Sequence, residues 1–212
     1  EILAALPQYG YIGVARDDGK EKGEYSAILY KKDRFDLKWQ KTTWLSETPD
    51  VPGSKSWDAA ITRVLTRGEF VDKKTARRFL YYNTHFDHIG KEARKRSAIL
   101  IKKAILQETP GQHDGDPNNV IKIIVTGAFT SQPTEDAYQQ LATSNLIYDS
   151  RPADSTEGTF CNFTVNSQPC TLIDYIFHSI NLKVTDYKVI KDNDGTYYPS
   201  DHLPVMVTFS FE

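Results

Sequence analysis

The sequence predicts an α/β protein in which β-sheets pack together and helices lie outside them. Short segments rich in β-branched and aromatic residues recur along the chain, and aromatic residues make up 12% of it. Only two helical patterns interrupt these segments, which favours packed sheets with helices outside. A chain of 212 residues can form one large domain with a full core. We therefore expect a single domain over residues 1–212.

The strands are predicted from apolar runs and from alternation of apolar and polar residues. The last run places Val205, Val207, Phe209 and Phe211 on one face, which is the period of a half-buried strand. A turn at residues 72–75 joins two runs into a hairpin. The predicted strands cover residues 11–15, 26–31, 35–45 (broken), 61–71, 78–84, 121–125, 146–148, 159–163, 171–177, 182–189 and 205–211.

Two helices are predicted between these strands. Residues 91–108 carry Ala98, Ile101 and Ile105 on one face and end before a Pro-Gly pair. Residues 133–141 begin with a proline followed by two acids, as a helix N-terminus favours. The long polar segment 112–119 is predicted to be a loop.

Composition and charge restrict the class of partner. The formal net charge of −2 gives no overall field toward nucleic acid or anionic membranes. No apolar run has the length of a membrane span, and no signal-peptide pattern is present. A polyanionic substrate therefore needs a local basic patch or a metal ion, and we expect a monomer.

Cys161 and Cys170 flank a short polar loop that contains the glycosylation pattern Asn162-Phe163-Thr164. Their spacing suits a hairpin closed by a disulfide, although two cysteines can equally be buried thiols. The two signals together favour a secreted, glycosylated eukaryotic protein.

Acids and imidazoles follow several predicted strands, where ligands commonly bind in sheet proteins. His202 could polarise a substrate oxygen, and it needs an acceptor to fix its tautomer. Asp174 is the natural acceptor, because an acid within an apolar strand is costly to bury unpaired. The alternative is a purely structural pair that ties two strands together. Asp201, next in sequence to His202, points the other way along extended backbone.

The segment from Asn83 to His88 is denser in polar side chains. His85 and Asp87 share one face of an extended segment, and the two histidines with the acid could bind a metal or a phosphate beside it. A polar strand end satisfied by its neighbours is an equally good interpretation. Trp57, which follows a flexible loop, could stack on a substrate.

Four motifs occur in a fixed order: Asn83-Thr84-His85, Gly-x-Phe-x-Ser at 127–131, Ile173-Asp174-Tyr175-Ile176-Phe177 and Ser200-Asp201-His202-Leu203-Pro204. This pattern resembles the endonuclease/exonuclease/phosphatase family of metal-dependent phosphoesterases, which includes deoxyribonuclease I. Residues 44–60 are similar to a subgroup of small stand-alone members with poorly defined substrates. The resemblance runs from Leu6 to the C-terminus and implies a deoxyribonuclease I-like α/β sandwich of two packed mixed β-sheets flanked by helices.

The resemblance also implies roles for individual residues. His85 and His202 would donate hydrogen bonds to the scissile phosphate from two sides, and Asp174 would orient His202. Arg63 would face the phosphate, and Asp201 would lie near a Mg²⁺ or Mn²⁺ ion. A divalent cation and fixed donors stabilise the charge that develops when water attacks a phosphoester.

The chain differs from the family pattern at the strand end whose side chains would activate water. The family has Gly-Asp-Phe-Asn at this strand end, whereas this chain has Ala128 and Thr130 in place of the acid and the amide. An alanine cannot accept a proton or hold a water molecule. The family's first strand and metal-binding glutamate are also missing, since residues 1–6 resemble the end of a helix with no N-cap before it.

We therefore predict a phosphoesterase, with possible nuclease or phosphodiesterase activity, that is truncated at its N-terminus and defective in activating water. The alternative is a non-catalytic descendant that binds phosphorylated ligands or a partner through the surviving side chains. The substrate stays open among nucleic acid, nucleotide, phospholipid and sugar phosphate. A serine hydrolase is excluded, because no Gly-x-Ser-x-Gly elbow is present and adjacent residues cannot form a triad.

Overall fold

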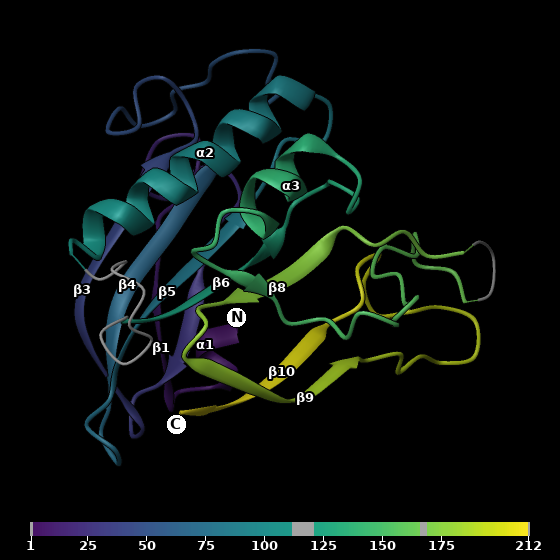
Figure 1. Ribbon diagram of the computed structural model, residues 1–212. Coiled ribbons are helices and arrows are strands. Elements are labelled where there is room, and N and C mark those ends of the chain that lie inside the picture. The colour runs from purple at the N-terminus through teal and green to yellow at the C-terminus, as the bar shows by residue number, and fades with distance from the viewer. Residues whose placement is uncertain (1, 112–120, 166–168, 212) are drawn as a thin grey trace.

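A computed structural model describes residues 2–111, 121–165 and 169–211. A six-stranded mixed sheet forms the centre of the molecule (Figure 1). In spatial order it contains β3 (Phe35–Trp44), β4 (Val64–Asp72), β5 (Arg78–His85), β6 (Lys122–Ala128), β8 (Asp174–His178) and β7 (Tyr148–Asp149). Strand β6 runs parallel to β5 and antiparallel to β8, so it links two antiparallel halves.

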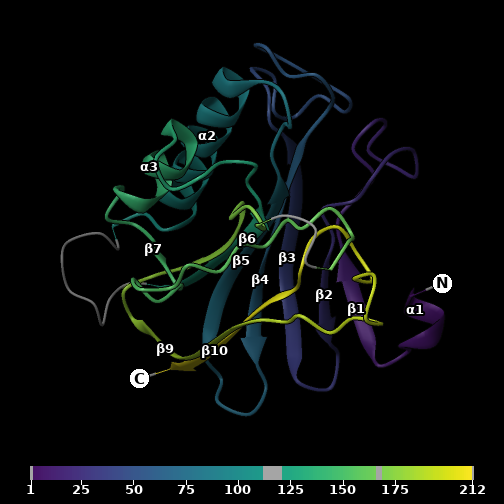
Figure 2. The ribbon, with the colours of Figure 1, turned by 90° about the vertical axis from the view of Figure 1, so that its right-hand side faces the viewer.

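Two antiparallel strand pairs lie against one face of this sheet and form a second β-layer. They are β1 (Tyr9–Ile12) with β2 (Ile28–Lys31), and β9 (Leu182–Val189) with β10 (Val205–Phe211). Their apolar side chains, including Ile12, Ile28 and Leu182, pack on Phe70 and Phe79 of the central sheet. The expected architecture of two packed β-layers with helices outside is therefore confirmed (Figure 2).

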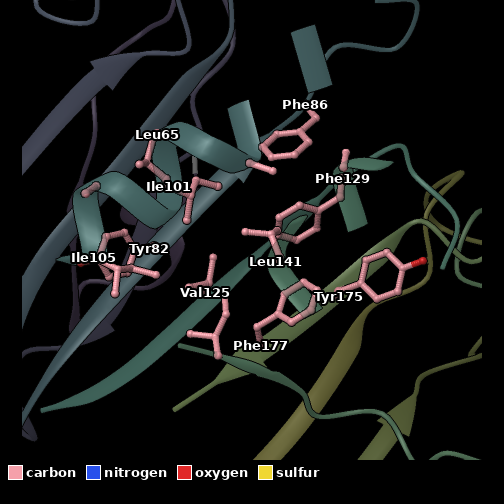
Figure 3. Close-up of a cluster of buried hydrophobic side chains, with 14 of the residues drawn as sticks. Leu65, Tyr82, Phe86, Ile101, Ile105, Val125, Phe129, Leu141, Tyr175 and Phe177 are labelled. Carbon is pink, nitrogen blue, oxygen red and sulfur yellow. The ribbon is translucent and has the colours of Figure 1, made fainter. Parts of the chain in front are cut away.

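Helices α2 (Lys91–Glu108) and α3 (Asp136–Ala142) cover the opposite face of the central sheet (Figures 1 and 2). The larger hydrophobic cluster lies between these helices and the central sheet, and Figure 3 shows part of it. Ile101 and Ile105 of α2 are fully buried there, as the sequence pattern predicted. A further short helix, α1 (Ile2–Ala5), precedes β1, and no helix of the described residues is long and apolar enough to cross a membrane.

An apolar cavity of about 440 Å³ lies between β2 and β10, the facing strands of the two pairs. Tyr30, Phe35, Val207 and Phe211 are among its lining residues. Strands β2 and β10 do not pair with each other, so the second layer consists of two separate sheets.

The disulfide between Cys161 and Cys170 is confirmed. Its loop is tied to the C-terminal part of the site, because the backbone N–H of Cys161 donates to the carbonyl of Asp201 at 2.8 Å. The exposed Asn162 and Phe163 both have positive φ, 54° and 65°.

Several predicted elements need correction. Residues 159–163 do not form a strand, because Phe160 makes only isolated bridges, to Thr171 and His202. Strand β8 begins at Asp174 rather than at residue 171, and β4 begins at Val64, so that Arg63 precedes it. Strand β6 extends past residue 125 to Ala128, because it is paired on both sides. The loop predicted at 112–119 lies outside the described residues, which stop at Gly111 and resume at Ile121.

We predict that Cys161→Ala with Cys170→Ala lowers the free energy of unfolding by about 2–3 kcal/mol, because the disulfide restricts the unfolded chain. Urea denaturation of the oxidised protein and of the double variant measures the difference. Reduced wild-type protein is the matched control and should lose the same amount. A loss below about 0.5 kcal/mol in both would contradict a stabilising role for the disulfide.

Candidate functional site

Three predicted site residues form one row across the central sheet. His85 at the end of β5 lies directly opposite Ala128 at the end of β6, and Ala128 lies opposite Asp174 at the start of β8. Directly opposed residues in paired strands project from the same face of a sheet. The side chains of His85, Ala128 and Asp174 therefore emerge together, with the alanine methyl group in the middle.

The close approach of β5 and β6 at this edge depends on Gly127. A Cβ atom at Gly127 would lie 2.3 Å from the carbonyl oxygen of Thr84, a distance no side chain tolerates. Glycine alone can occupy this position without separating the strands. The glycine of the 127–131 motif is thus required for the close packing of β5 and β6.

Asp174 and His202 meet as predicted. Nδ1 of His202 lies 2.9 Å from each carboxylate oxygen of Asp174. The hydroxyl of Thr159 donates to Oδ2 of Asp174 at 2.6 Å, which fixes the carboxylate. Asp174 raises the pKa of His202 above its ordinary value through this hydrogen bond. Since Nδ1 is engaged, Nε2 is the ring nitrogen left to face a ligand.

His85 has the opposite electrostatic environment. Burial, followed by the nearby charge of Arg63, lowers the pKa of His85 to about 4. His85 is therefore a neutral imidazole at neutral pH. One of its nitrogens can then donate a hydrogen bond to a ligand without adding a full positive charge.

Arg63 lies just before β4 and is buried, with 5% of its side chain exposed. Its Nη2 lies 3.2 Å from Nδ1 of His88, and its Nε lies 3.8 Å from Oδ2 of Asp87. Nε and Nη1 have no hydrogen-bond partner among the described residues. Buried guanidinium nitrogens are normally paired, so these two are in place to bind an anion.

Asp87 occupies a different environment from the one the sequence predicted. Strand β5 ends at His85, and the Asp87 side chain is only 1% exposed. Its Oδ2 accepts the N–H groups of Ala60 and Ile61, and its Oδ1 accepts those of Ile89 and Gly90. These bonds lower the pKa of Asp87 to about 2 although burial alone would raise it. Asp87 thus holds together the loops on either side of Arg63 and is turned away from solvent.

Asp201 and Trp57 are less closely associated with this row. Asp201 is partly exposed, and its Oδ1 lies 3.4 Å from the hydroxyl of Ser200. Trp57 is partly buried in the loop that leads to Arg63, with φ of 57°. No hydrogen bond or ring contact joins Trp57 to His85 or His202 in the part of the chain described.

The donor set was tested against a divalent cation. Within residues 2–111, 121–165 and 169–211, no group of three or more His, Cys, Asp or Glu side chains could hold a metal ion. Mg²⁺ is commonly bound by one or two carboxylates together with substrate oxygens and water. The described side chains therefore form no preformed cage for a metal ion, and Asp201 would supply a single carboxylate to an ion held mainly by substrate oxygens and water.

Sequence analysis missed Arg16, Glu24 and Thr159. Arg16 pairs with Glu24 in the turn after β1, next to Arg63 and His85. Two opposite charges, eight residues apart in the segment between the first two predicted strands, were the available signal. Thr159 could not be found in this way, because its contact with Asp174 joins residues 15 positions apart across a loop.

Comparison with known proteins identifies the class. No family model matches the chain. A crystal structure of an endonuclease/exonuclease/phosphatase family protein from Bacteroides thetaiotaomicron is 40% identical, with a TM-score of 0.90 over 100% of this chain and 78% of the other. A mannosyl-6-phosphatase of the same bacterium is also 40% identical, with a TM-score of 0.88 over 99% of this chain and 80% of that protein. The chain belongs to the endonuclease/exonuclease/phosphatase family.

More distant matches also cover nearly the whole chain. An uncharacterized protein of Acanthamoeba polyphaga mimivirus is 26% identical over 99% of this chain and 79% of its own length. The human Nocturnin catalytic domain with bound sulfate is 21% identical with a TM-score of 0.75, which supports the fold. The relatives include a phosphatase, so the resemblance is to hydrolases that act on phosphoesters.

Phe129 anchors the backbone between Ala128 and Thr130 in the core. It is 1% exposed and contacts Phe86 edge-on, with ring centroids 5.0 Å apart, and Phe177 at 5.5 Å (Figure 3). The next residue, Thr130, has φ of 47°. A β-branched residue is strained in this region, whereas asparagine adopts it readily. The backbone conformation at position 130 would therefore suit an asparagine better than Thr130.

We predict that Thr130→Asn raises the free energy of unfolding by about 0.5–1 kcal/mol, because asparagine tolerates positive φ. Chemical denaturation gives the value. Thr130→Val is the matched control, since it keeps the branched Cβ and should give no gain. Equal stability of the two variants would show that backbone strain at position 130 is negligible.

Proposed function

We propose that this chain is a phosphoesterase-type hydrolase whose site retains its phosphate-binding groups and has lost its efficient water-activating groups. The observation that carries the proposal is the buried Arg63 with two unpartnered guanidinium nitrogens, next to the imidazole of His85. Membership of the family supports a phosphoester as the ligand. The phosphate would lie between Arg63 and His85 on one side and Nε2 of His202 on the other.

The paired imidazoles would have different tasks. Neutral His85 would donate a hydrogen bond to a non-bridging oxygen, and the hydrogen bond to Asp174, which raises the pKa of His202, would favour a protonated His202 more than is usual for histidine. Fixed donors of this kind stabilise the charge that develops on a phosphoryl group in the transition state. Asp174 would act as a positioning residue, because it contacts the ring of His202.

We expect slow turnover because of Ala128, which occupies the middle of the row between His85 and Asp174. The methyl group of Ala128 cannot accept a proton from water, and Thr130 offers a single hydroxyl where the family has an amide. If any Mg²⁺ or Mn²⁺ takes part, Asp201 is the side chain we propose to contact it, together with substrate oxygens. Trp57 is proposed to touch the substrate outside the phosphate.

We also propose that the chain forms one domain and that an additional strand completes its second layer. The apolar cavity between the unpaired facing edges of β2 and β10 supports this proposal.

The second candidate function is binding without turnover. Ala128 favours it, since the phosphate donors are intact while the position of the general base is blank. Sugar phosphates, nucleotides, phospholipids and nucleic acids are all compatible with a phosphate site of this kind. The relative named as a mannosyl-6-phosphatase supports a sugar phosphate among them.

Restoring the acid and the amide separates the two functions. We predict that Ala128→Asp with Thr130→Asn raises hydrolysis of p-nitrophenyl phosphate or bis(p-nitrophenyl) phosphate, with Mg²⁺ or Mn²⁺, at least about a hundredfold, because a positioned general base contributes this much. Steady-state release of p-nitrophenol is the measurement.

Two controls make this test specific. Thr130→Asn alone should relieve strain without restoring activity, and His202→Gln in the double variant should abolish the gain. Rapid turnover by the unmodified chain would show that Ala128 does not mark the water-activating position. Silence of the double variant, with phosphate binding retained, would favour the binding function.

We further propose that the protein is secreted and glycosylated. The disulfide and the exposed Asn162 in its Asn-Phe-Thr pattern support this. Expression through a eukaryotic secretory pathway should give a product whose mass falls on treatment with an N-glycosidase, unlike Asn162→Gln. Identical masses for both proteins before treatment would exclude a glycan at this position.

A further inference from the structure

A narrow cleft opens beside His85. It lies between the turn that follows β1 and the start of β4, and it has room for about one water-sized atom. The turn is held in place by a bridge between Ala15 and Tyr25 and by the N–H of Arg16 donating to the carbonyl of Glu24. The cleft is lined by Arg16, Glu24, Tyr25, Ser26, Arg63, Val64 and His85.

Two guanidinium groups present unpartnered nitrogens at this cleft. Nε and Nη1 of Arg63 have no hydrogen bond, and neither does the buried Nε of Arg16, among the described residues. The two arginines are close enough that the charge of Arg16 lowers the pKa of Arg63, after the larger effect of burial. Two neighbouring cations with unsatisfied donors are stable only when an anion or water satisfies them.

The acids near the cleft orient the arginines without satisfying these donors. Glu24 accepts a hydrogen bond from Nη1 of Arg16, which leaves the Nε edge free. Asp17 lies 3.8 Å from that Nε and accepts instead from the hydroxyl of Thr62 at 2.6 Å. Asp87 is engaged by four backbone N–H groups, as described above. The free donors of Arg16 and Arg63 therefore remain for a ligand.

We propose that this cleft is a specificity pocket that takes a terminal phosphoryl oxygen between Arg16 and Arg63, so that the site selects phosphate monoesters over phosphate diesters. The inference rests on the phosphate site proposed above and names its substrate class. Arg16 is then a substrate-binding residue rather than part of a surface ion pair.

Size and charge both favour this selectivity. A monoester presents an additional bare oxygen that is small enough for the cleft and accepts hydrogen bonds from both guanidinium groups. A diester has only two bare oxygens, so when these face His85 and His202 the remaining non-leaving oxygen carries a carbon substituent, which the cleft has no room for. A monoester also carries close to two negative charges above pH 7, which suits two arginines, whereas a diester carries one.

Binding of two small esters tests the inference. Methyl phosphate and dimethyl phosphate are titrated into the protein at pH 8, and dissociation constants are taken from amide chemical shifts in NMR spectra. We expect the wild-type chain to bind the monoester at least about tenfold more tightly, as charged hydrogen bonds allow. Arg16→Gln should weaken the monoester about tenfold and change diester affinity less than about twofold.

Two further variants control for a general loss of positive charge and for disturbance of the turn that carries Arg16. Arg96→Gln removes a positive charge from α2, where Arg96 pairs with Glu92 and 53% of its side chain is exposed, and it should leave both affinities unchanged. Arg16→Lys keeps the charge, so it should retain part of the preference and shows whether the turn tolerates substitution.

The outcomes separate this inference from the function on which it rests. Equal wild-type affinity for the two esters, or a parallel loss of both in Arg16→Gln, overturns the specificity pocket and leaves the phosphate site intact. Failure of the wild-type chain to bind either ester overturns the phosphate site and the pocket together.

Discussion

The close contact between β5 and β6 at Gly127 is the constraint on which the site depends. It brings the last residues of two parallel strands to the same edge of the sheet, and β8 adds its first residue from the other side. Phe129, buried among Phe86 and Phe177, then holds the chain in place as it leaves the sheet (Figure 3). The row of His85, Ala128 and Asp174 is a geometric consequence of this pairing.

In this site the backbone framework is independent of the side chain that it presents at position 128. The framework around position 128 consists of Gly127, the buried Phe129 and the left-handed backbone at Thr130. Ala128 places only a methyl group within it. Packing and backbone geometry here do not depend on a carboxylate at position 128, so the fold forms without one. The phosphate site proposed above draws its donors from other strands and loops, so it does not depend on the side chain at position 128.

The charged side chains of the site come from several segments that are far apart in the sequence. Arg63 is held beside Asp87, which is itself satisfied by backbone N–H groups, and Arg16 is held by Glu24. Each acid orients or balances its arginine without occupying all its donors, so the pair keeps capacity for an anion. His85 stays neutral beside them because burial and Arg63 lower its pKa. This division allows one neutral and several positive donors to meet in a small volume.

The sequence by itself determined the strand-rich α/β fold, helix α2 and the pairing of Asp174 with His202, because periodicity and the cost of burying an unpaired acid are local signals. Only the tertiary structure decided that β6 reaches Ala128, that Asp87 is buried under backbone N–H groups, and that Arg16 lies next to Arg63. These features arise from contacts between segments far apart in the sequence, which no local pattern encodes. The sequence could show that position 128 carries an alanine, but the packing of Gly127 and Phe129 around it could be recognised only in three dimensions.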